Sequence, residues 1–412
     1  MAVLAVVGLI GGQFANYAIY NWCWYPRAIS PWAPKPAEAA ARSWWDRLPV
    51  VGWISLRRES ELHGGGFWVR PLLIELSLAA ALPLLYLHVC PWGGLLSPAD
   101  RNPATIAALQ NWMNQVYFAQ AFLVVLMTAA TFIDFDEQTI PDLITIPGTL
   151  IAIGLASGTL NVFLPAIPFG AVRAPYLWAT FEHPWLPTPK VTQFWTGSVG
   201  LRTGLLIWSG WCFALADRRV ILRRGLAKAV QYFFAGLTRH WTWRLLLAMW
   251  VAGLIAICLI WNVGGLHWWG CLSSLVGLAV GGGSVWAVRI VASSAMRVEA
   301  MGFGDVTLMA MIGAFVGWQA SLAAFFLAPM AAIVIVIVQY IVTREPRVPF
   351  GPYLCAGTML TIWFWDQVYN VNLAPNLALM GPVMLWLVLT MLALMGVMLF
   401  VWRLIKQSLL RG

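Results

Sequence analysis

Long apolar segments, each about twenty residues, recur along the whole chain and constrain its fold more than any other feature, because this length matches the hydrocarbon core of a bilayer. The chain has 412 residues, of which 61% are hydrophobic and 10% charged. That leaves far too little polar surface to coat a soluble globule. The sequence therefore predicts an all-α fold: a polytopic integral membrane bundle of about 10–11 transmembrane helices.

The predicted spans are 3–22, 71–92, 113–133, 143–163, 198–216, 245–262, 271–293, 306–318, 321–342, 350–365 and 380–402. The segment 306–318 is short for a full crossing, so we expect it to be tilted or joined to its neighbour.

The basic residues predict the orientation of the chain, because Lys and Arg in short loops stay on the cytoplasmic side of a membrane. Most of the 25 Lys and Arg residues fall in alternate loops, chiefly 23–70 and 217–244, and in the carboxy-terminal tail. The amino terminus then faces outward and the carboxy terminus inward, which predicts a multi-pass protein of the cell inner (plasma) membrane. These loops and their attraction to anionic lipid account for the net charge of +9, so we expect no nucleic-acid partner.

Two aspartates stand at the edges of predicted spans. Asp134 ends the span 113–133 and Asp305 precedes the span 306–318, both on the predicted cytoplasmic side. An ionisable group in such a place is by default a candidate functional site. A lone aspartate could simply cap a helix, but two on one membrane face favour a catalytic pair. Facing each other in a partly dry cleft, they would share a proton, so that one deprotonates water and the other protonates a departing nitrogen.

The surroundings of Asp134 suggest how it is presented. Pro141 suits the first turn of the next helix, and Asp142 sits at the start of that helix. We expect Asp134 to point into the bundle, while Asp136 and Glu137 remain hydrated and secondary.

The surroundings of Asp305 are rich in small residues. Gly302 and Gly304 are expected to let the backbone turn tightly and a substrate strand approach. Gly313 and Gly317 would give the following helix a small face for close packing, and 281–283 (GGG) would allow close helix contact in the same way.

Three ordered segments carry a resemblance to a known family. Residues 302–305 (GFGD) resemble the GxGD signature of prepilin peptidases, the type IV leader peptidases. Residues 133–147, which contain Asp134 and end at Pro147, resemble the first-aspartate block of that family. Residues 349–352 (PFGP), with Pro349 and Gly351, resemble a downstream segment. Weaker similarity in the amino-terminal region, including 46–50, extends the resemblance over roughly 1–163 and 270–365.

The resemblance implies a membrane-embedded aspartic endopeptidase with Asp134 and Asp305 as catalytic residues. Its substrates would be type IV prepilin or pseudopilin-like precursors, cleaved after a glycine at the cytoplasmic face. The other partner would be membrane lipid. Supporting roles would fall to the motif residues Gly302, Gly304, Pro141, Asp142, Pro349 and Gly351.

This chain departs from the family pattern in its amino-terminal loop. Family members commonly carry two CxxC pairs there, associated with a zinc-bearing domain and N-methylation, whereas residues 25–70 hold no cysteine. Structural zinc needs about four Cys or His ligands, and this loop offers only His63. We therefore expect no zinc, no other cofactor and doubtful N-methyltransferase activity, with S-adenosylmethionine required only if methylation is retained. A second departure is Thr307, where the family usually has Lys.

The predicted domain organisation follows from these matches. Residues 1–92 form the amino-terminal spans and cytoplasmic loop, and residues 93–163 and 270–365 form the peptidase core. Residues 164–269 are an insertion with two spans and a basic loop. Residues 366–412 hold the last span and a basic tail.

Other functions remain open on the sequence. The chain could be a transporter that uses Asp134 and Asp305 as ion or proton sites, although no internal inverted repeat is visible. It could also be a catalytically silent assembly protein. A presenilin-type protease is disfavoured, because its Pro-Ala-Leu element is matched only by 375–377 (PNL).

Overall fold

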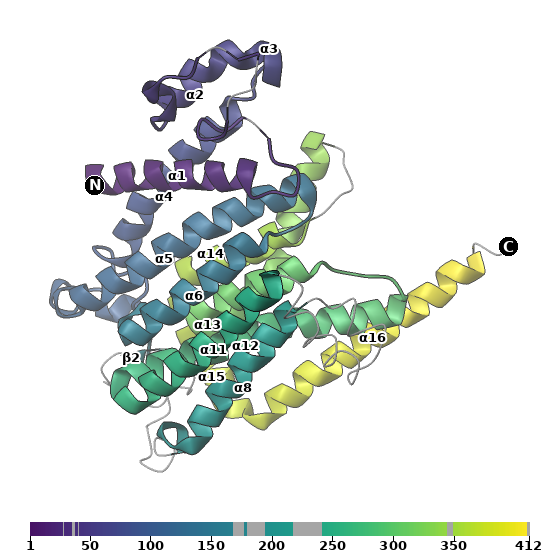
Figure 1. Cartoon of the computed structure of the whole chain (residues 1–412). Helices are drawn as coiled ribbons and strands as arrows, with labels where there is room; N and C mark the ends of the chain where they lie inside the picture. Colours follow the sequence, from purple (N-terminus) through teal and green to yellow (C-terminus); the bar gives the residue numbers. More distant parts are fainter. Residues whose placement is uncertain are drawn as a thin grey trace.

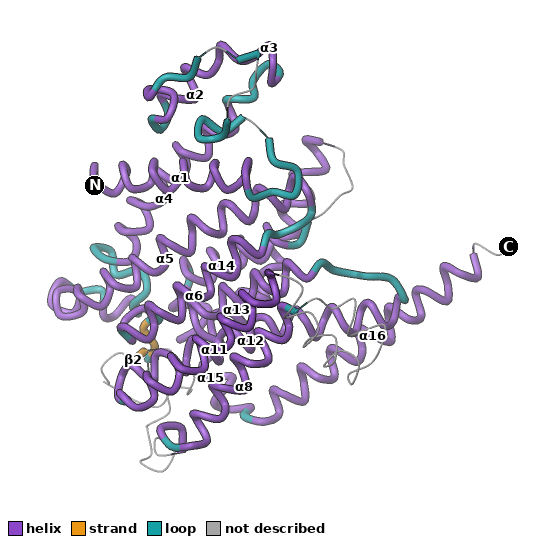
Figure 2. The backbone as a smooth tube through the Cα atoms, in the orientation of Figure 1, coloured by secondary structure: helices purple, strands orange, loops and turns teal. Residues whose placement is uncertain are grey.

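The computed structural model describes residues 1–27, 29–34, 38–39, 41–167, 177–178, 194–216, 241–343 and 349–409. Helices make up nearly all of it, and the strands β1 (Pro165–Ala166) and β2 (Leu177–Trp178) pair antiparallel (Figure 2). The long helices are α1 (Ala2–Asn21), α4 (Val69–Val89), α5 (Pro103–Glu137), α6 (Asp142–Gly158), α8 (Ser198–Leu215), α11 (Trp241–Val263), α12 (Gly265–Met296), α13 (Phe303–Thr343), α14 (Gly351–Trp363) and α16 (Pro382–Leu409).

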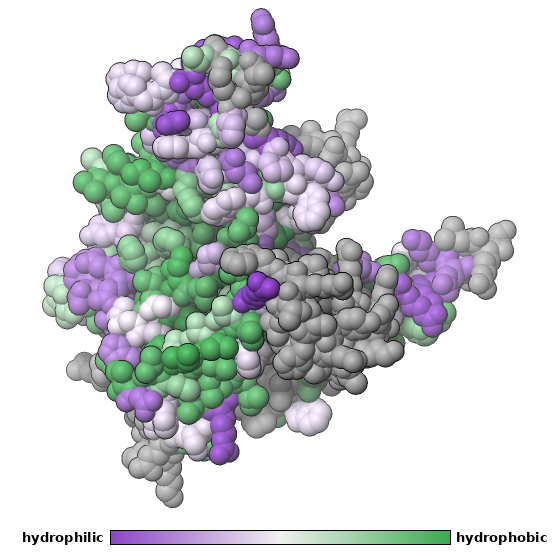
Figure 3. All heavy atoms as spheres, viewed as in Figure 1, coloured by the Kyte–Doolittle hydropathy of each residue, from purple (hydrophilic) through white to green (hydrophobic). Residues whose placement is uncertain are grey.

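The predicted all-α membrane bundle is confirmed. Seven of the described helices are long and apolar enough to cross a membrane, namely α1, α4, α5, α11, α12, α13 and α16. The shorter helices α6, α8 and α14 occupy the other predicted spans. Apolar side chains cover the flank of the bundle, and polar ones gather over the loop that carries the short helices α2 (Val51–Ser55) and α3 (Ser60–His63) (Figure 3). The basic loop at 217–240 lies outside the described residues.

Helix α13 contains two of the predicted spans. The short span 306–318 is joined to its neighbour 321–342, as expected, but the backbone breaks between them at Gly317, where φ is 82° and ψ is 171°. This conformation is strained for residues with a side chain, and glycine adopts it freely. The break separates a buried half-helix that begins at Phe303 from an outer half that runs to Thr343.

Helices α12 and α13 pack backbone to backbone through glycines (Figure 1). A Cβ added at Gly277 would stand 2.0 Å from the Gly313 carbonyl oxygen, and one added at Gly281 would stand 2.5 Å from the Met309 carbonyl oxygen. The predicted small-residue faces therefore exist and hold these two helices as one unit. Gly283 differs from its neighbours, because a Cβ added there would have no atom within 4 Å.

The amino-terminal loop projects from one end of the bundle (Figure 1) and is organised by two buried carboxylates. Asp46 accepts hydrogen bonds from both terminal nitrogens of Arg58, at 2.9 and 2.6 Å, and from the Ser55 hydroxyl. Glu59 is paired in the same way with Arg42 at 3.0 and 2.8 Å. The guanidinium of Arg58 thus fits the buried Asp46 carboxylate bidentately, a geometry that favours a strong ion pair.

A third buried carboxylate ties this loop to the bundle. Glu75 of α4 accepts hydrogen bonds from the Val50 N–H at 2.6 Å and from the Trp53 indole at 2.8 Å. Asn16 of α1 donates to the same carboxylate at 3.3 Å. Trp53 therefore packs in the interior rather than serving as an interfacial anchor, whereas Trp44 and Trp45 are exposed and stack on each other.

The two ion pairs make the loop sensitive to acid. Hydrogen bonds from Arg58 hold the pKa of Asp46 below its ordinary value. Burial alone would raise the pKa of Glu59, but the hydrogen bonds and charge of Arg42 outweigh it and lower that pKa. Stability that comes from depressed carboxyl pKa values is fully present above the unfolded pKa of about 4 and is lost as the pH falls below it.

We therefore expect amide exchange across residues 41–63, corrected for intrinsic rates, to accelerate below about pH 4. Asp46→Ala should produce the same loosening at pH 7, because it leaves the Arg58 guanidinium without its partner at a cost of about 1–3 kcal/mol. Glu61→Ala, at an exposed position of the same loop, is the matched control. Unchanged exchange in Asp46→Ala would show that the ion pairs do not stabilise this loop.

Candidate active site

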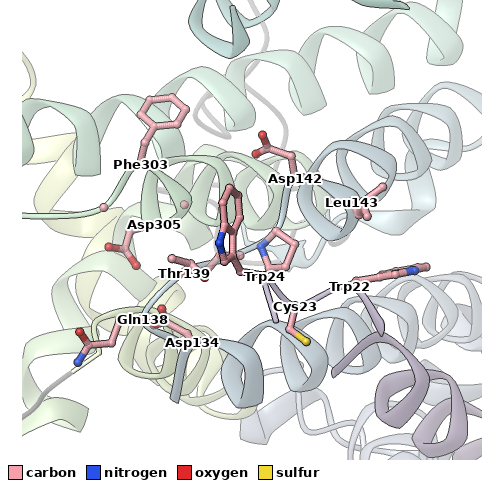
Figure 4. Close-up of a pocket in the computed structure, with 14 residues that line it drawn as sticks. Trp22, Cys23, Trp24, Asp134, Gln138, Thr139, Asp142, Leu143, Phe303 and Asp305 are labelled. Carbon is pink, nitrogen blue, oxygen red and sulfur yellow. The ribbon is translucent and has the colours of Figure 1, made fainter. Parts of the chain in front are cut away.

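A cavity of about 550 Å³ opens at the end of the bundle where α5 ends and α13 begins. Its walls come from four separate stretches of the chain: the segment after α1, the last turn of α5, the turn into α6 with the first residues of that helix, and the start of α13 (Figure 4). Its lining residues are Trp22, Cys23, Trp24, Asp134, Gln138, Thr139, Ile140, Pro141, Asp142, Leu143, Gly302, Phe303, Gly304 and Asp305. Both predicted catalytic aspartates therefore line one cavity, although they come from distant helices.

Asp134 lies in the last turn of α5, where its side chain is buried. The backbone N–H of Gly351, the first residue of α14, donates to its Oδ2 atom at 3.0 Å. A Cβ added at Gly351 would stand 2.7 Å from that same oxygen. Only glycine thus lets the start of α14 approach closely enough to fix the carboxylate, which gives Gly351 a specific reason to be glycine.

Asp305 lies in the first turn of α13, as predicted, and is also buried. Carboxylates are favoured there because the helix dipole is positive at its amino-terminal end. The charges of Asp134 and of Arg289, on α12, both act on Asp305. The two carboxyl groups therefore interact electrostatically within a largely dry site.

Arg289 is a residue of this site that the sequence reasoning missed. Its Nε donates to the Met301 carbonyl at 2.8 Å, its terminal nitrogen pairs with Glu299, and its guanidinium lies 5.7 Å from the Phe303 ring centroid. It thereby fixes the turn that leads into Asp305. A basic residue inside the predicted span 271–293 was the available signal, because charged residues within spans are rare and usually functional.

Ile140 packs between the two aspartate-bearing ends. A Cβ added at Gly304 would stand 2.9 Å from the Ile140 Cβ, and one added at Gly351 would stand 2.9 Å from the Ile140 Cδ1. The backbone side of this residue thus contacts the start of α13, and its side-chain tip contacts the start of α14. Ile140 is buried and acts as a spacer between neighbours of Asp305 and Asp134.

The two signature glycines both line the cavity but have different surroundings. Neither Gly302 nor Gly304 adopts a left-handed backbone conformation. Gly304 is instead needed for its contact with Ile140, whereas a Cβ added at Gly302 would lie 3.8 Å from Asp305 Oδ2, an ordinary contact. Close packing therefore explains the glycine at position 304, and the expected approach of a substrate strand past both glycines stays a prediction.

The three neighbouring carboxylates are placed differently from one another. Asp136 forms an ion pair with Arg70 at 2.8 Å, outside the cavity lining. Glu137 is not merely hydrated as expected, because its carboxylate accepts the backbone N–H groups of Trp24 at 2.6 Å and Tyr25 at 3.0 Å. Asp142 is the first residue of α6 and lines the cavity, directly after Pro141 at the helix N-cap.

Pro349 and Thr307 are buried near the starts of the two helices that contribute to the site. Pro349 is buried just before α14. Thr307 is buried in the first turns of α13, and its hydroxyl donates to the Gly304 carbonyl at 3.0 Å. Thr307 therefore stabilises the turn around Asp305 and brings no charge there.

Comparison with known proteins finds one family model that matches part of this site. Residues 238–337 match the model of the type IV leader peptidase family, a range that contains Asp305 and its signature. The match starts within the segment 164–269 that the sequence predicts to be an insertion, and the predicted domain boundaries stay a prediction.

Several curated relatives align with parts of the chain. The prepilin leader peptidase/N-methyltransferase of Myxococcus xanthus (strain DK1622) is 32% identical over 153 residues, which cover 37% of this chain and 39% of that protein. The protein of the same name from Burkholderia pseudomallei (strain 1026b) is 29% identical over 122 residues, covering 28% of this chain and 40% of that protein. That from Escherichia coli (strain K12) is 29% identical over 93 residues, covering 22% of this chain and 41% of that protein. The chain thus spans about two fifths of the length of these relatives, and no solved structure matches it.

Proposed function

We propose, from its relationship to the type IV leader peptidase family, that this chain is a membrane-embedded aspartic endopeptidase. The observation that carries the proposal is the presence of two buried carboxyl groups, Asp134 and Asp305, in the wall of one cavity. Aspartic proteolysis requires two such groups within reach of one water molecule and one peptide bond.

In the proposed reaction, one carboxyl group is ionised and the other carries a proton. The ionised group takes a proton from water, and the resulting hydroxide attacks the carbonyl carbon of the scissile peptide bond. The protonated group then gives its proton to the departing nitrogen, so that the C–N bond breaks and the pair has exchanged roles. The Gly351 N–H at 3.0 Å fixes the orientation of Asp134 during both steps.

The proposed substrates are type IV prepilin or pseudopilin-like precursors, cleaved between the leader and the apolar helix that follows it. Three features support this choice: the names of the curated relatives, the position of the cavity at one end of the bundle, and the apolar flank of the bundle (Figure 3). With the apolar helix of the precursor in the bilayer, its leader would reach the cavity from the cytoplasm. We accordingly propose the inner membrane as the location and its cytoplasmic face as the side of cleavage.

The decisive experiment is incubation of the purified membrane protein with pilin-like precursors encoded near its gene. A wild-type-dependent decrease in precursor size, absent with Asp305→Asn, would support the peptidase. Unchanged precursors would favour a transporter or a catalytically silent assembly protein, the two other functions that the sequence leaves open.

We further propose that cleavage occurs without zinc and without methylation, although the names of the relatives include N-methyltransferase. The loop of this chain is held by the Asp46–Arg58 and Glu59–Arg42 ion pairs, and His63, its single histidine, is within 3.3 Å of Glu59. We expect elemental analysis of the purified protein to find zinc far below one equivalent, and mass spectrometry to find an unmodified new amino terminus on the product. Stoichiometric zinc, or a methylated product made by this protein alone, would contradict this proposal.

A further inference from the structure

The segment that follows α1 forms part of the cavity wall, a position that its sequence did not predict. Trp22, Cys23 and Trp24 all line the cavity that holds Asp134 and Asp305. Figure 4 shows the indole of Trp24 in the middle of this view, between Asp305 and Asp142. A segment from the start of the chain is thus brought against carboxyl groups that belong to α5 and α13.

This segment is attached directly to the helix that carries Asp134. Glu137, one turn after Asp134 on α5, accepts the N–H groups of Trp24 at 2.6 Å and Tyr25 at 3.0 Å with its two carboxylate oxygens. Hydrogen bonds to an ionised carboxylate are about twice as strong as those between neutral groups. The backbone at Trp24 therefore keeps a fixed position relative to Asp134.

The backbone of Trp24 is held by Glu137, but little protein packs around its side chain. Its exposed fraction is 78%, whereas Trp53, Trp268 and Trp365 are fully buried. An exposed indole at the wall of a cavity offers a large, rigid surface at low entropic cost, and such residues dominate many binding sites. Interfacial anchoring is the usual role of tryptophan in membrane proteins, but it does not require a backbone attached to the helix of a catalytic residue.

We propose that Trp24 is a specificity-determining residue that packs against the extended peptide substrate, and that Glu137 is the positioning residue that holds it there. The inference rests on the proposed function. The occupant is the segment of the precursor next to the scissile bond, which must be extended to place its carbonyl between two carboxyl groups. Trp24 then adds binding energy beside the reacting atoms without taking part in the proton transfers.

This role predicts a defined kinetic signature. Trp24→Ala should raise KM for precursor cleavage roughly tenfold, which corresponds to about 1.4 kcal/mol, and leave kcat within about twofold. Trp24→Phe should recover most of the loss, because a flat aromatic surface remains. Glu137→Ala should shift KM in the same direction, and Glu137→Gln less, because its amide oxygen can still accept one N–H group. Trp44→Ala is the matched control, since Trp44 is 60% exposed on the loop and does not line the cavity.

A binding measurement separates this inference from the proposed function. The affinity of a synthetic peptide that spans the leader junction is compared in Asp305→Asn protein with and without Trp24→Ala. Weaker binding on removal of the indole supports the inference even if the wild-type protein cleaves nothing. Equal affinity, an unchanged KM, or an equal effect from Trp44→Ala would overturn it, and lower thermal stability with unchanged KM would assign Trp24 to anchoring.

Discussion

Asp134→Asn and Asp305→Asn should each lower the rate of precursor cleavage by roughly 10²–10⁴-fold, while the protein still folds and binds its substrate. Asparagine keeps the size of aspartate but can neither accept a proton from water nor donate one to a leaving nitrogen. Single-turnover assays in detergent or vesicles would measure the loss. The double variant should be hardly slower than either single variant, because residues that act as one unit give non-additive effects.

Asp136→Asn is the control for this pair, since Asp136 lies two residues from Asp134 but forms an ion pair with Arg70 outside the cavity lining. We expect it to retain most of the activity. An equal loss in Asp136→Asn and Asp134→Asn would show that the wrong carboxylate has been assigned to the chemistry.

Gly351→Ala should cost about 10²-fold in kcat, an effect that is large for the addition of one methyl group. The new Cβ would stand 2.7 Å from Asp134 Oδ2 and 2.9 Å from Ile140 Cδ1, so the carboxylate or the start of α14 must move. The N–H bond that orients Asp134 would be lengthened or lost at the same time. Single-turnover cleavage would report the lost activity, and the thermal unfolding temperature would show whether the bundle survives.

Gly302→Ala is the matched control for Gly351→Ala, because both glycines lie next to a site carboxylate. The Cβ added at Gly302 would meet Asp305 Oδ2 at 3.8 Å, an ordinary contact distance. We expect activity within a few-fold of wild type for this variant. If Gly302→Ala were as damaging as Gly351→Ala, close packing would not explain the glycine at 351.

Hydropathy and spacing were sufficient to predict the bundle and its most polar site. The predicted helix boundaries at the end of α5 and the start of α13 are correct to within a few residues, and the aspartates located there line one cavity. Helix boundaries were less predictable: α5 extends about ten residues before the predicted start at 113, because its first turns are too polar to register as a span.

The sequence did not predict which residues from separate segments of the chain form hydrogen bonds and ion pairs with each other. Glu137 was expected in water because it lies in a polar stretch, and nothing in the sequence paired Arg58 with Asp46. Their actual partners, Asp46 and the N–H groups of residues 24 and 25, depend on how separate segments of the chain meet. The contacts of Arg289 with residues 299–303 were not predicted either, although its charge within an apolar span was a usable signal.

Ile140 contacts the neighbours of both carboxylates, so its side chain lies at the position that separates the two halves of the site. Asp305 lies on α13, which packs closely against α12 through glycines, whereas Asp134 belongs to α5. We therefore expect the gap between the two carboxyl groups to depend on the size of the side chain at position 140. A series of Val, Leu and Met at position 140 would adjust the gap in sub-ångström steps while both carboxyl groups stay intact. If the proposed proteolysis is correct, substitutions at this uncharged residue would change its rate without altering either carboxyl group.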